Sequence, residues 1–570
     1  MRFLIVAPRF VKKIGDYYSF PVGPAYISGA LKAAGFDVEC LNMNHHDWST
    51  LSRVIRQRDI DVVCTGAISP FYRQVHRVLE VARKANPRIK VVGGGGIVSS
   101  EPELITELLG LDFGVIGEGE ETIVELATAL TQGGDFSRIA GLVYRDKDGT
   151  IRRNPDRKVK ADLDAIPWPD YEGFEIARYM DQTLPSDFMH SYIFDDPREM
   201  PIVASRSCPF DCTFCYLPMG RIYRARSLDG FFAEVDYLIA RYRPNILSIY
   251  DDLFAVKKDR LVEFCSRIKR YGIHWMAQLR VNIMTPEILE MMKDAGCYYI
   301  SYGLESGSPE ILKSMKKKIT VEQIEYTLAE TRKARIGFQG NFLFGDLNDT
   351  VETVQESLDW FRRHPQYQIL LIPVGAYPGS ELYVKAVEQG KIPDKREFIK
   401  AGSPIVNVSK MSDHEYQQML HELARTANEL RLVPRALSRR LKGWRSVGPV
   451  YELRFQCPHC QEIQTYRNVR LHAYEHTLAG CRVCHGRFWF PPVYPQWARF
   501  LARDYLEMKL RVLGPRKFLV KGLAVLLSTL LKVLGVRSDR TVIEEWIDPL
   551  LPRFPARRVA RLAAESGKNS

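Results

Sequence analysis

Short apolar runs alternate with amphipathic segments over most of the first 400 residues, and no other feature constrains the fold as strongly. In residues 1–135 the predicted strands are Phe3–Ala7, Val38–Leu41, Val62–Gly66, Val91–Gly93 and Phe113–Ile116. Helical stretches such as Tyr72–Ala85 lie between them. Strands joined by helical crossovers form a parallel sheet, which binds ligands beyond the carboxyl ends of its strands. The sequence therefore predicts a doubly wound, Rossmann-like α/β domain.

A second series of strands and helices follows and predicts a partial (β/α)6 barrel. Its expected strands are Ile202–Ser205, Ile246–Tyr250, Trp275–Leu279, Tyr298–Gly303, Asn341–Phe344 and Ile369–Ile372. In such a barrel the chemistry lies at the carboxyl ends of the strands. Between the two series, Gly141–Arg153 predicts a hairpin with a turn at Asp148-Gly149. The paired prolines of Ile166–Asp170 indicate an extended linker.

These patterns divide the 570-residue chain into six parts. We expect a Rossmann-like domain (1–135), a hairpin and linker (136–195), the barrel (196–400), a helical connector (401–445), a four-cysteine ribbon (446–495) and a basic helical tail (496–570). Hydrophobic residues make up 46% and charged residues 26% of the chain. Those values exclude wholesale disorder, collagen and a coiled coil.

Two glycine-rich turns follow predicted strands of the first domain, at Gly93–Gly96 and at Gly117–Glu120. Neither has the G-x-G-x-x-G spacing of a dinucleotide fingerprint. Two interpretations stay open: plain tight turns, or backbone that touches a flat or anionic cofactor. The candidates for such contact are Gly94, Gly95, Gly117 and Glu118.

Three cysteines in a C-x3-C-x2-C pattern, Cys208, Cys212 and Cys215, directly follow the first strand of the second series. Three thiolates on one loop can hold three irons of a 4Fe-4S cluster and leave the fourth iron open to a substrate or cofactor. A structural zinc site would need a distant fourth ligand. Of the 11 cysteines, seven lie in close-spaced sets, which is typical of metal ligands and of a reducing cytoplasm. The opening run Phe3–Ala7 is too short for a signal peptide.

From these cysteines onward, residues 200–400 resemble the radical S-adenosylmethionine superfamily. The resemblance extends to Tyr250–Phe254, Gln278–Asn282, Gly303–Ser308, Gly345–Thr350 and Tyr377–Leu382, each at or just beyond a predicted strand. It implies a 4Fe-4S cluster whose open iron chelates S-adenosylmethionine, and a reductant such as a flavodoxin or ferredoxin. One electron would cleave the sulfonium and give a 5′-deoxyadenosyl radical that removes hydrogen from an unreactive carbon.

The resemblance also implies residue roles, although it assigns no catalytic residue. Cys208, Cys212 and Cys215 would be the cluster ligands, and Phe214 would pack over the cluster or the adenine. Asp251 and Asp252 would face the methionine ammonium, unless they cap a helix. Glu305 and Ser306 are candidates for the ribose and methionyl group. Gln278 and Arg280 would orient cofactor or substrate, or form a structural ion pair. We expect Asp346 and Asp349 to cap the helix that begins near Thr350.

The first domain resembles the cobalamin-binding class of radical enzymes, which includes methyltransferases and ring-forming enzymes. The matching segments are Pro21–Tyr26, Gly93–Gly96 with Glu101–Glu103, and Gly117–Thr122. Cobalamin is therefore an implied cofactor. One departure is that the D-x-H-x-x-G motif, which supplies a histidine to cobalt, is absent, since residues 1–150 contain no Asp-x-His. We interpret His45 and His46 as polar loop residues rather than substitutes.

Four further cysteines, Cys457, Cys460, Cys481 and Cys484, form C-x2-C-x20-C-x2-C, which predicts a zinc ribbon. An auxiliary iron–sulfur cluster is the competing interpretation. Residues 431–520 hold 17 basic and 5 acidic side chains, which accounts for the entire net charge of +12. This basic segment indicates an anionic partner.

Three interpretations of the basic segment stay open. Clustered arginines with aromatic side chains (Phe455, Tyr466, Phe488, Trp489 and Phe490) could pair with RNA phosphates and stack on bases. Alternatively, the apolar run within Lys517–Lys532, too short to span a bilayer, would lie on an anionic membrane surface. That would place the protein at the periphery of the inner membrane face. The third interpretation is a core helix packed on the ribbon.

The leading functional hypothesis is a radical enzyme acting on an unactivated carbon of a lipid, glycolipid or secondary metabolite, by methylation, cyclisation or rearrangement. A second hypothesis is RNA modification with the ribbon holding the RNA. A third, non-enzymatic hypothesis is an iron–sulfur sensor.

Overall fold

The computed structural model describes residues 1–11, 16–185, 194–445, 448–473 and 475–494, together with Leu523, Leu526 and Leu527. The chain divides into two compact units, Met1–Arg470 with Leu478–Phe488, and Leu471–Thr477 with Trp489–Ser570. Apart from the three leucines, the predicted helical tail and the run Lys517–Lys532 lie outside the described residues. No helix in the described part of the chain combines the length and the apolar character needed to cross a bilayer.

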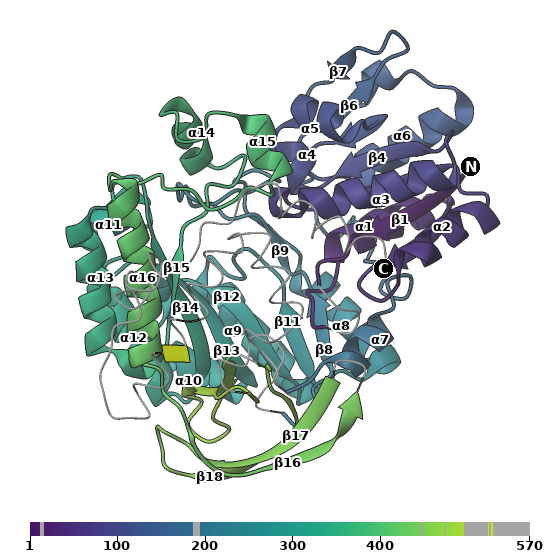
Figure 1. Ribbon diagram of the computed structural model, residues 1–570. Coiled ribbons are helices and arrows are strands. Elements are labelled where there is room, and N and C mark those ends of the chain that lie inside the picture. The colour runs from purple at the N-terminus through teal and green to yellow at the C-terminus, as the bar shows by residue number, and fades with distance from the viewer. Residues whose placement is uncertain are drawn as a thin grey trace. The chain divides into compact units, whose positions relative to one another are not determined.

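The N-terminal domain is a parallel sheet covered by helices on both faces, as predicted (Figure 1). Its strands are β1 (Arg2–Ala7), β2 (Asp37–Asn42), β3 (Val62–Gly66), β4 (Lys90–Gly94) and β5 (Phe113–Val115), in the order β2-β1-β3-β4-β5. Its helices are α1 (Val22–Ala33), α2 (Trp48–Gln57), α3 (Tyr72–Ala85), α4 (Gly96–Ser100), α5 (Pro102–Leu109) and α6 (Glu120–Gln132). Apart from β2, at the edge of the sheet, the strands are mostly buried, which explains why their apolar runs were recognisable in the sequence.

The predicted hairpin, β6 (Leu142–Arg145) and β7 (Ile151–Arg153), belongs to this sheet instead of standing apart from it. β6 pairs antiparallel with β5, with Val115 opposite Leu142. Without the hairpin β5 would be an exposed edge with unpaired backbone groups, so the addition protects the sheet.

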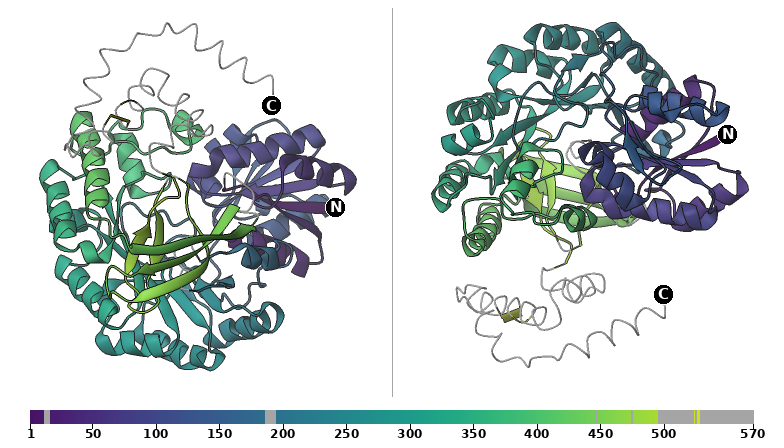
Figure 2. Two further views of the ribbon diagram at one scale, coloured as in Figure 1. Left: turned by 60° about the horizontal axis from the view of Figure 1, so that its bottom comes forward. Right: turned by 90° about the horizontal axis from the view of Figure 1, so that it is seen from above.

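The barrel has six parallel strands in the order β8-β11-β12-β13-β14-β15. They are β8 (Glu199–Ile202), β11 (Ile246–Ile249), β12 (His274–Leu279), β13 (Cys297–Glu305), β14 (Gly337–Phe344) and β15 (Leu370–Pro373). The crossover helices are α8 (Leu228–Tyr242), α9 (Lys258–Ile268), α10 (Pro286–Asp294), α11 (Pro309–Ser314), α12 (Val321–Lys333) and α13 (Val351–Arg363). Figure 2 shows the barrel beside the N-terminal domain, and both belong to the first unit.

The first barrel strand differs from the prediction Ile202–Ser205. β8 begins at Glu199 and contains Pro201, which is tolerated because β8 is the edge strand of its sheet. Ser205–Arg206 form a separate short strand, β9, which pairs antiparallel with β10 (Arg224–Ala225). This two-stranded ladder lies at the start and the end of the segment that carries Cys208, Cys212 and Cys215.

Helices α14 (Glu381–Glu388), α15 (Lys395–Lys400) and α16 (Asp413–Glu429) follow the barrel. The helical connector predicted for 401–445 is correct for α16 but wrong for its end, because β16 (Arg435–Arg445) is a strand. β16 forms an antiparallel sheet with β17 (Gly448–Gln456) and β18 (Ile463–Arg470), so the ribbon module begins about ten residues earlier than predicted. The strands β19 (Thr477–Gly480) and β20 (Arg487–Phe490) form a second, two-stranded sheet.

Candidate cofactor site

The loop with the three cysteines is anchored to the barrel by backbone hydrogen bonds. The Thr213 amide donates to the Met315 carbonyl at 3.2 Å, and the Leu382 amide donates to the Thr213 carbonyl at 2.8 Å. Cys212 is buried, whereas Cys208 and Cys215 are half-buried, and all three thiols are free of disulfides. Phe214 is partly buried against an apolar cluster that includes Ala376 and Leu382. The loop is thereby held with its thiols near the surface of the barrel mouth.

Cationic side chains surround the middle thiol of this set. The Cys215 thiol, together with the charges of Lys317 and Arg280, lowers the pKa of Cys212 to about 6. Lys317 Nζ also donates to Glu305 Oε1 at 2.7 Å, and the Arg280 guanidinium lies 3.7 Å from the centre of the Phe210 ring. An electropositive setting favours the thiolate form that binds iron.

The two neighbouring aspartates, Asp251 and Asp252, differ in their surroundings. Asp251 is buried and accepts hydrogen bonds from the Ala204 amide at 2.8 Å and from Ser205 Oγ at 2.7 Å. Burial raises the pKa of Asp251 to about 7. Asp252 is exposed at the edge of a large cavity, and Gln278 Nε2 donates to its carbonyl at 3.0 Å. Asp251 therefore fastens β11 to the start of the cysteine segment, and Asp252 lines the cavity.

The predicted residues at the end of β13 are mostly engaged with the protein. Glu305 pairs with Lys317 and has a φ of +69°, so it forms the turn that ends the strand. Ser306 is buried, with its Oγ 3.0 Å from Ser357 Oγ.

The N-cap of α13 is Thr350, and not Asp346 or Asp349 as predicted. Asp349 instead accepts hydrogen bonds from the Gly345 amide and the Thr353 hydroxyl, both at 2.7 Å.

A cavity of about 640 Å³ joins the N-terminal domain to the barrel mouth. The four candidate residues of the first domain, Gly94, Gly95, Gly117 and Glu118, all line it. From the barrel side its wall includes Ser205, Arg206, Tyr250 and Asp252. Gly117 has a φ of +71°, and a Cβ there would approach one atom, the Pro218 carbonyl oxygen at 3.8 Å. The backbone at Gly117 is therefore bare toward this space, as close approach by a flat ligand requires.

Two buried arginines, one on each side of the cysteine segment, bind the second glycine-rich turn. Arg224 donates to Glu118 Oε1 at 2.6 Å and to Glu118 Oε2 at 3.0 Å. Arg206 donates to Glu120 Oε1 at 2.6 Å, and its guanidinium lies 4.8 Å from the centre of the Tyr26 ring. We call these four charged residues the arginine clamp. No local sequence pattern reveals this clamp, because its partners are 86 and 106 positions apart.

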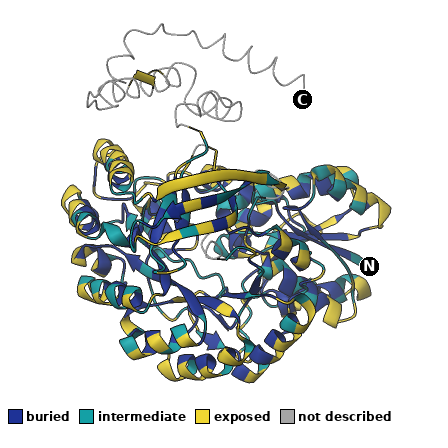
Figure 3. Ribbon diagram, turned by 90° about the horizontal axis from the view of Figure 1, so that it is seen from below, coloured by how far each residue is buried: buried dark blue, intermediate teal, exposed yellow. Residues whose placement is uncertain are grey.

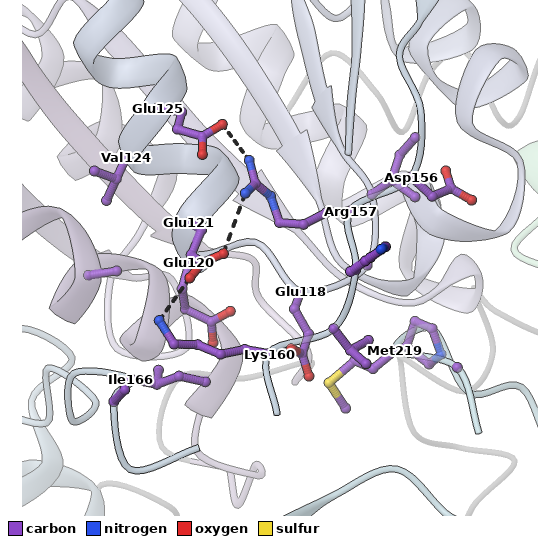
Figure 4. Close-up of a pocket in the computed structure, with 18 of the residues that line it drawn as sticks. Glu118, Glu120, Glu121, Val124, Glu125, Asp156, Arg157, Lys160, Ile166 and Met219 are labelled. Carbon is purple, nitrogen blue, oxygen red and sulfur yellow. Dashed lines mark hydrogen bonds and ion pairs between the residues drawn. The ribbon is translucent and has the colours of Figure 1, made fainter. Parts of the chain in front are cut away.

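A second cavity of about 610 Å³ lies on the other side of the clamp and shares Glu118 and Glu120 with the first. Figure 4 shows Arg157 between Glu121 and Glu125, and Lys160 directed at Glu121. Arg157 and Lys160 thus form ion pairs with the two glutamates of this wall. The two glutamates of the clamp therefore line both cavities.

His45 and His46 have the structural role expected of polar loop residues. His45 is buried, with Nε2 2.7 Å from the Tyr18 hydroxyl and Nδ1 3.0 Å from Glu175 Oε2. His46 Nε2 lies 2.8 Å from the same oxygen. Neither residue lines the 640 Å³ cavity.

The four cysteines of the ribbon form a separate, closed set. The Sγ atoms of Cys457 and Cys484 are 3.9 Å apart, and those of Cys460 and Cys481 are 3.7 Å apart. Four thiolates around a tetrahedral zinc with Zn–S bonds of about 2.3 Å lie about 3.8 Å from one another. The module contacts the amino ends of the barrel strands, where Arg482 pairs with Asp195 at 2.7 Å just before β8. It therefore lies at the opposite end of the barrel from Cys208, Cys212 and Cys215.

Two family models match the chain. A B12 binding domain matches residues 14–127, and the radical SAM superfamily matches residues 202–361. An uncharacterised methyltransferase from Pyrococcus horikoshii is 29% identical over 401 residues, which are 68% of this chain and 83% of the relative. An anaerobic magnesium-protoporphyrin IX monomethyl ester cyclase from Rubrivivax gelatinosus is 29% identical over 60% of this chain and 62% of its own length.

Among solved structures, the radical S-adenosylmethionine methyltransferase TsrM from Kitasatospora setae, with cobalamin and a 4Fe-4S cluster bound, has the same fold. Its TM-score is 0.60 at 19% identity, over 75% of this chain and 88% of TsrM. These comparisons confirm both resemblances drawn from the sequence.

Proposed function

The chain is a radical S-adenosylmethionine enzyme with an N-terminal B12-binding domain, and we propose that it transfers a methyl group to an unactivated carbon of a lipid, glycolipid or secondary metabolite. One observation carries this proposal: a single cavity of about 640 Å³ is lined both by the glycine turns of the B12-binding domain and by the barrel mouth. A corrinoid bound there would lie beside the cysteine segment, as methyl transfer through two cofactors requires.

Bound S-adenosylmethionine and its cluster would supply a radical that removes hydrogen, and a corrinoid would supply a methyl carrier. We assign Cys208, Cys212 and Cys215 to the cluster. Lys317 and Arg280 favour the Cys212 thiolate, because they lower the pKa of that thiol. Asp252 is the better candidate than Asp251 to face the methionine ammonium, since Asp251 already accepts two hydrogen bonds from protein groups.

The other candidates divide by their contacts. Gly94, Gly95 and Gly117 line the cavity and would present backbone to the corrinoid. Glu118 lines it too, but both of its carboxylate oxygens accept from Arg224, so we assign it to positioning. Gln278 donates a hydrogen bond to the Asp252 backbone, and Arg280 packs on Phe210 in the cysteine segment. We therefore assign both residues to positioning.

Anaerobic reconstitution with iron, sulfide and hydroxocobalamin tests the proposal. We expect the absorption bands of both cofactors, and cleavage of S-adenosylmethionine to both 5′-deoxyadenosine and S-adenosylhomocysteine under reducing conditions. A methyl-labelled cofactor should then pass its label to a compound that accumulates in a strain lacking the gene. Formation of 5′-deoxyadenosine without S-adenosylhomocysteine or label transfer would contradict methyl transfer and favour ring formation.

We further propose that Cys457, Cys460, Cys481 and Cys484 bind zinc. The support is the spacing of their sulfur atoms, 3.7 and 3.9 Å, which fits a single tetrahedral ion. A zinc-to-protein ratio of one in metal analysis would agree. An excess of iron beyond one four-iron cluster would instead identify an auxiliary cluster.

A further inference from the structure

The outer strand of the ribbon module exposes an unusual combination of side chains. β16 is the edge strand of its three-stranded sheet, and residues 435–442 are all exposed (Figure 3). Its apolar side chains are unshielded: Leu437 is 39%, Leu441 51% and Trp444 75% exposed. Large apolar groups on an edge strand invite association, so a soluble protein normally avoids them.

The same strand is strongly basic. Arg435–Arg445 contains five basic residues and no acidic residue. Lys442 lies 3.9 Å from Glu452, whereas Arg435, Arg439 and Arg440 form no ion pair with any residue that the structure describes. Their charge is thus available to a partner, and that partner must be anionic.

The chemistry of the apolar groups distinguishes lipid from nucleic acid. Three of the aromatic residues that could have stacked on bases, Phe455, Tyr466 and Phe488, are buried in the core of the module. Stacking on RNA requires exposed aromatic faces. The large apolar side chains exposed on β16 are two leucines and one tryptophan, and leucine side chains neither pair with phosphates nor stack on bases. Tryptophan and leucine among basic residues are instead typical of a membrane interface.

We propose that β16 is a membrane-contact strand that binds the headgroup region of anionic lipids, with Leu441 and Trp444 entering the interface and Arg439 and Arg440 pairing with lipid phosphates. This inference goes beyond the proposed reaction and does not depend on it. It rests on residues other than the apolar run at Lys517–Lys532, which lies almost wholly outside the described residues.

Co-sedimentation of the full-length protein with vesicles tests the proposal. We expect binding to phosphatidylcholine vesicles that contain phosphatidylglycerol, weak binding to phosphatidylcholine alone, and weakening with added salt. Arg439→Gln with Arg440→Gln should lower affinity for the anionic vesicles by up to about 25-fold, at about fivefold per charge. Leu441→Ser with Trp444→Ser should lower it by about tenfold. The matched control, Arg53→Gln with Arg56→Gln on the exposed face of α2, should bind as the parent does.

Three results would overturn the proposal. The first is unchanged vesicle binding by both β16 variants, which would assign any lipid affinity to the C-terminal tail. The second is no vesicle binding by the parent protein. The third is a β16 variant that loses affinity for total RNA in filter binding but keeps the vesicle affinity of the parent. Amide hydrogen exchange of the unaltered protein needs no variant: anionic vesicles should slow exchange in residues 435–445, and unchanged exchange there contradicts lipid contact.

Discussion

The two cysteine sets lie at opposite ends of one barrel and differ in almost every physical respect. Cys208, Cys212 and Cys215 belong to one short segment beside a cavity, with Lys317 and Arg280 near the middle thiol. Cys457, Cys460, Cys481 and Cys484 come from two turns about 20 residues apart, and their donor atoms all lie within 4.8 Å of one another. As proposed, the first set would supply three ligands and leave one iron without a protein ligand, whereas the second would supply all four ligands of a zinc ion.

This difference shows how the same side chain serves two purposes. A closed tetrahedral site contributes folding free energy, because its ligands converge only in the folded module. A set of three cysteines on one short loop does not tie distant segments together, so contacts with the rest of the protein must hold that loop in place. Those contacts are the arginine clamp, the Asp251 hydrogen bonds and the backbone bonds of Thr213.

The largest effect should follow from removing a ligand of the open set. We expect Cys212→Ser to lose the iron–sulfur absorption and to reduce S-adenosylmethionine cleavage below detection, while zinc stays bound. Metal analysis and product chromatography measure both. The control Cys40→Ser keeps a hydroxyl that can replace the thiol donor to Asp170, so it should retain both metals. Loss of zinc in Cys212→Ser would contradict the conclusion that the two cysteine sets bind their metals independently.

Removing a ligand of the closed set should affect folding rather than chemistry. We expect Cys481→Ser to lose zinc and to unfold the ribbon module, since apparent binding free energies of structural zinc are about 10–16 kcal/mol in small domains. Iron content should stay the same. Limited proteolysis between residues 435 and 488 would reveal the change. A parallel fall in iron would mean that the second set also carries iron.

A third prediction concerns the arginine clamp. Glu118→Gln leaves the buried Arg224 without a charge partner, so we expect a loss of about 3–5 kcal/mol in the free energy of unfolding and weaker hydroxocobalamin binding. The matched control is Glu121→Gln at the start of α6, where the side chain is 45% exposed and its loss should cost about 0–1 kcal/mol. Denaturant titration and absorption titration measure these effects. Equal costs in the two variants would show that burial of the clamp is unimportant.

The smallest effect should come from Asp251. Its folded pKa of about 7 is above the usual value of about 3.9, so between these values the folded protein holds a proton that the unfolded chain releases. This carboxyl therefore makes the protein less stable as the pH rises from about 4 to 7.

Asp251→Asn should reduce that slope and raise the free energy of unfolding at pH 5 by about 1–2 kcal/mol. The new amide can donate to Ser205 Oγ, which can still donate to the Leu253 carbonyl at 2.9 Å. Thermal unfolding between pH 4 and 7 checks this, with Asp259→Asn in the exposed first turn of α9 as the control. A slope as steep in Asp251→Asn as in the parent would assign the proton to another group, such as the buried Asp349, whose pKa burial raises to about 6.

Much of the fold was predictable because buried strands have apolar sequences. β3 and α3 match their predicted ranges residue for residue, and the other strands of the first domain agree within one or two residues. The errors arose where pairing with another strand, rather than the local sequence, determines the secondary structure. β16 has an exposed, mixed sequence and is a strand because β17 pairs with it. The edge position of β8, which permits Pro201, is likewise a property of the assembled sheet.

The candidate site was predictable in its local motifs and not in its long-range contacts. The spacing of Cys208, Cys212 and Cys215 is encoded within eight residues, and the glycine turns follow their strands directly. The difference between Asp251 and Asp252 depends on which way each side chain points after β11. The partners Arg206 and Arg224 depend on how two domains meet, and nothing local in either segment specifies Glu118 or Glu120.

The arginine clamp has a consequence for how this enzyme can be rebuilt. A chimera that exchanges the first domain for that of a relative must preserve the charges at positions 118 and 120 together with those at 206 and 224. Otherwise two buried guanidinium groups lose their carboxylate partners, directly on either side of the cysteine segment. The two domains thus form a matched pair, and substitutions on one side of the joint constrain which substitutions the other side can accept.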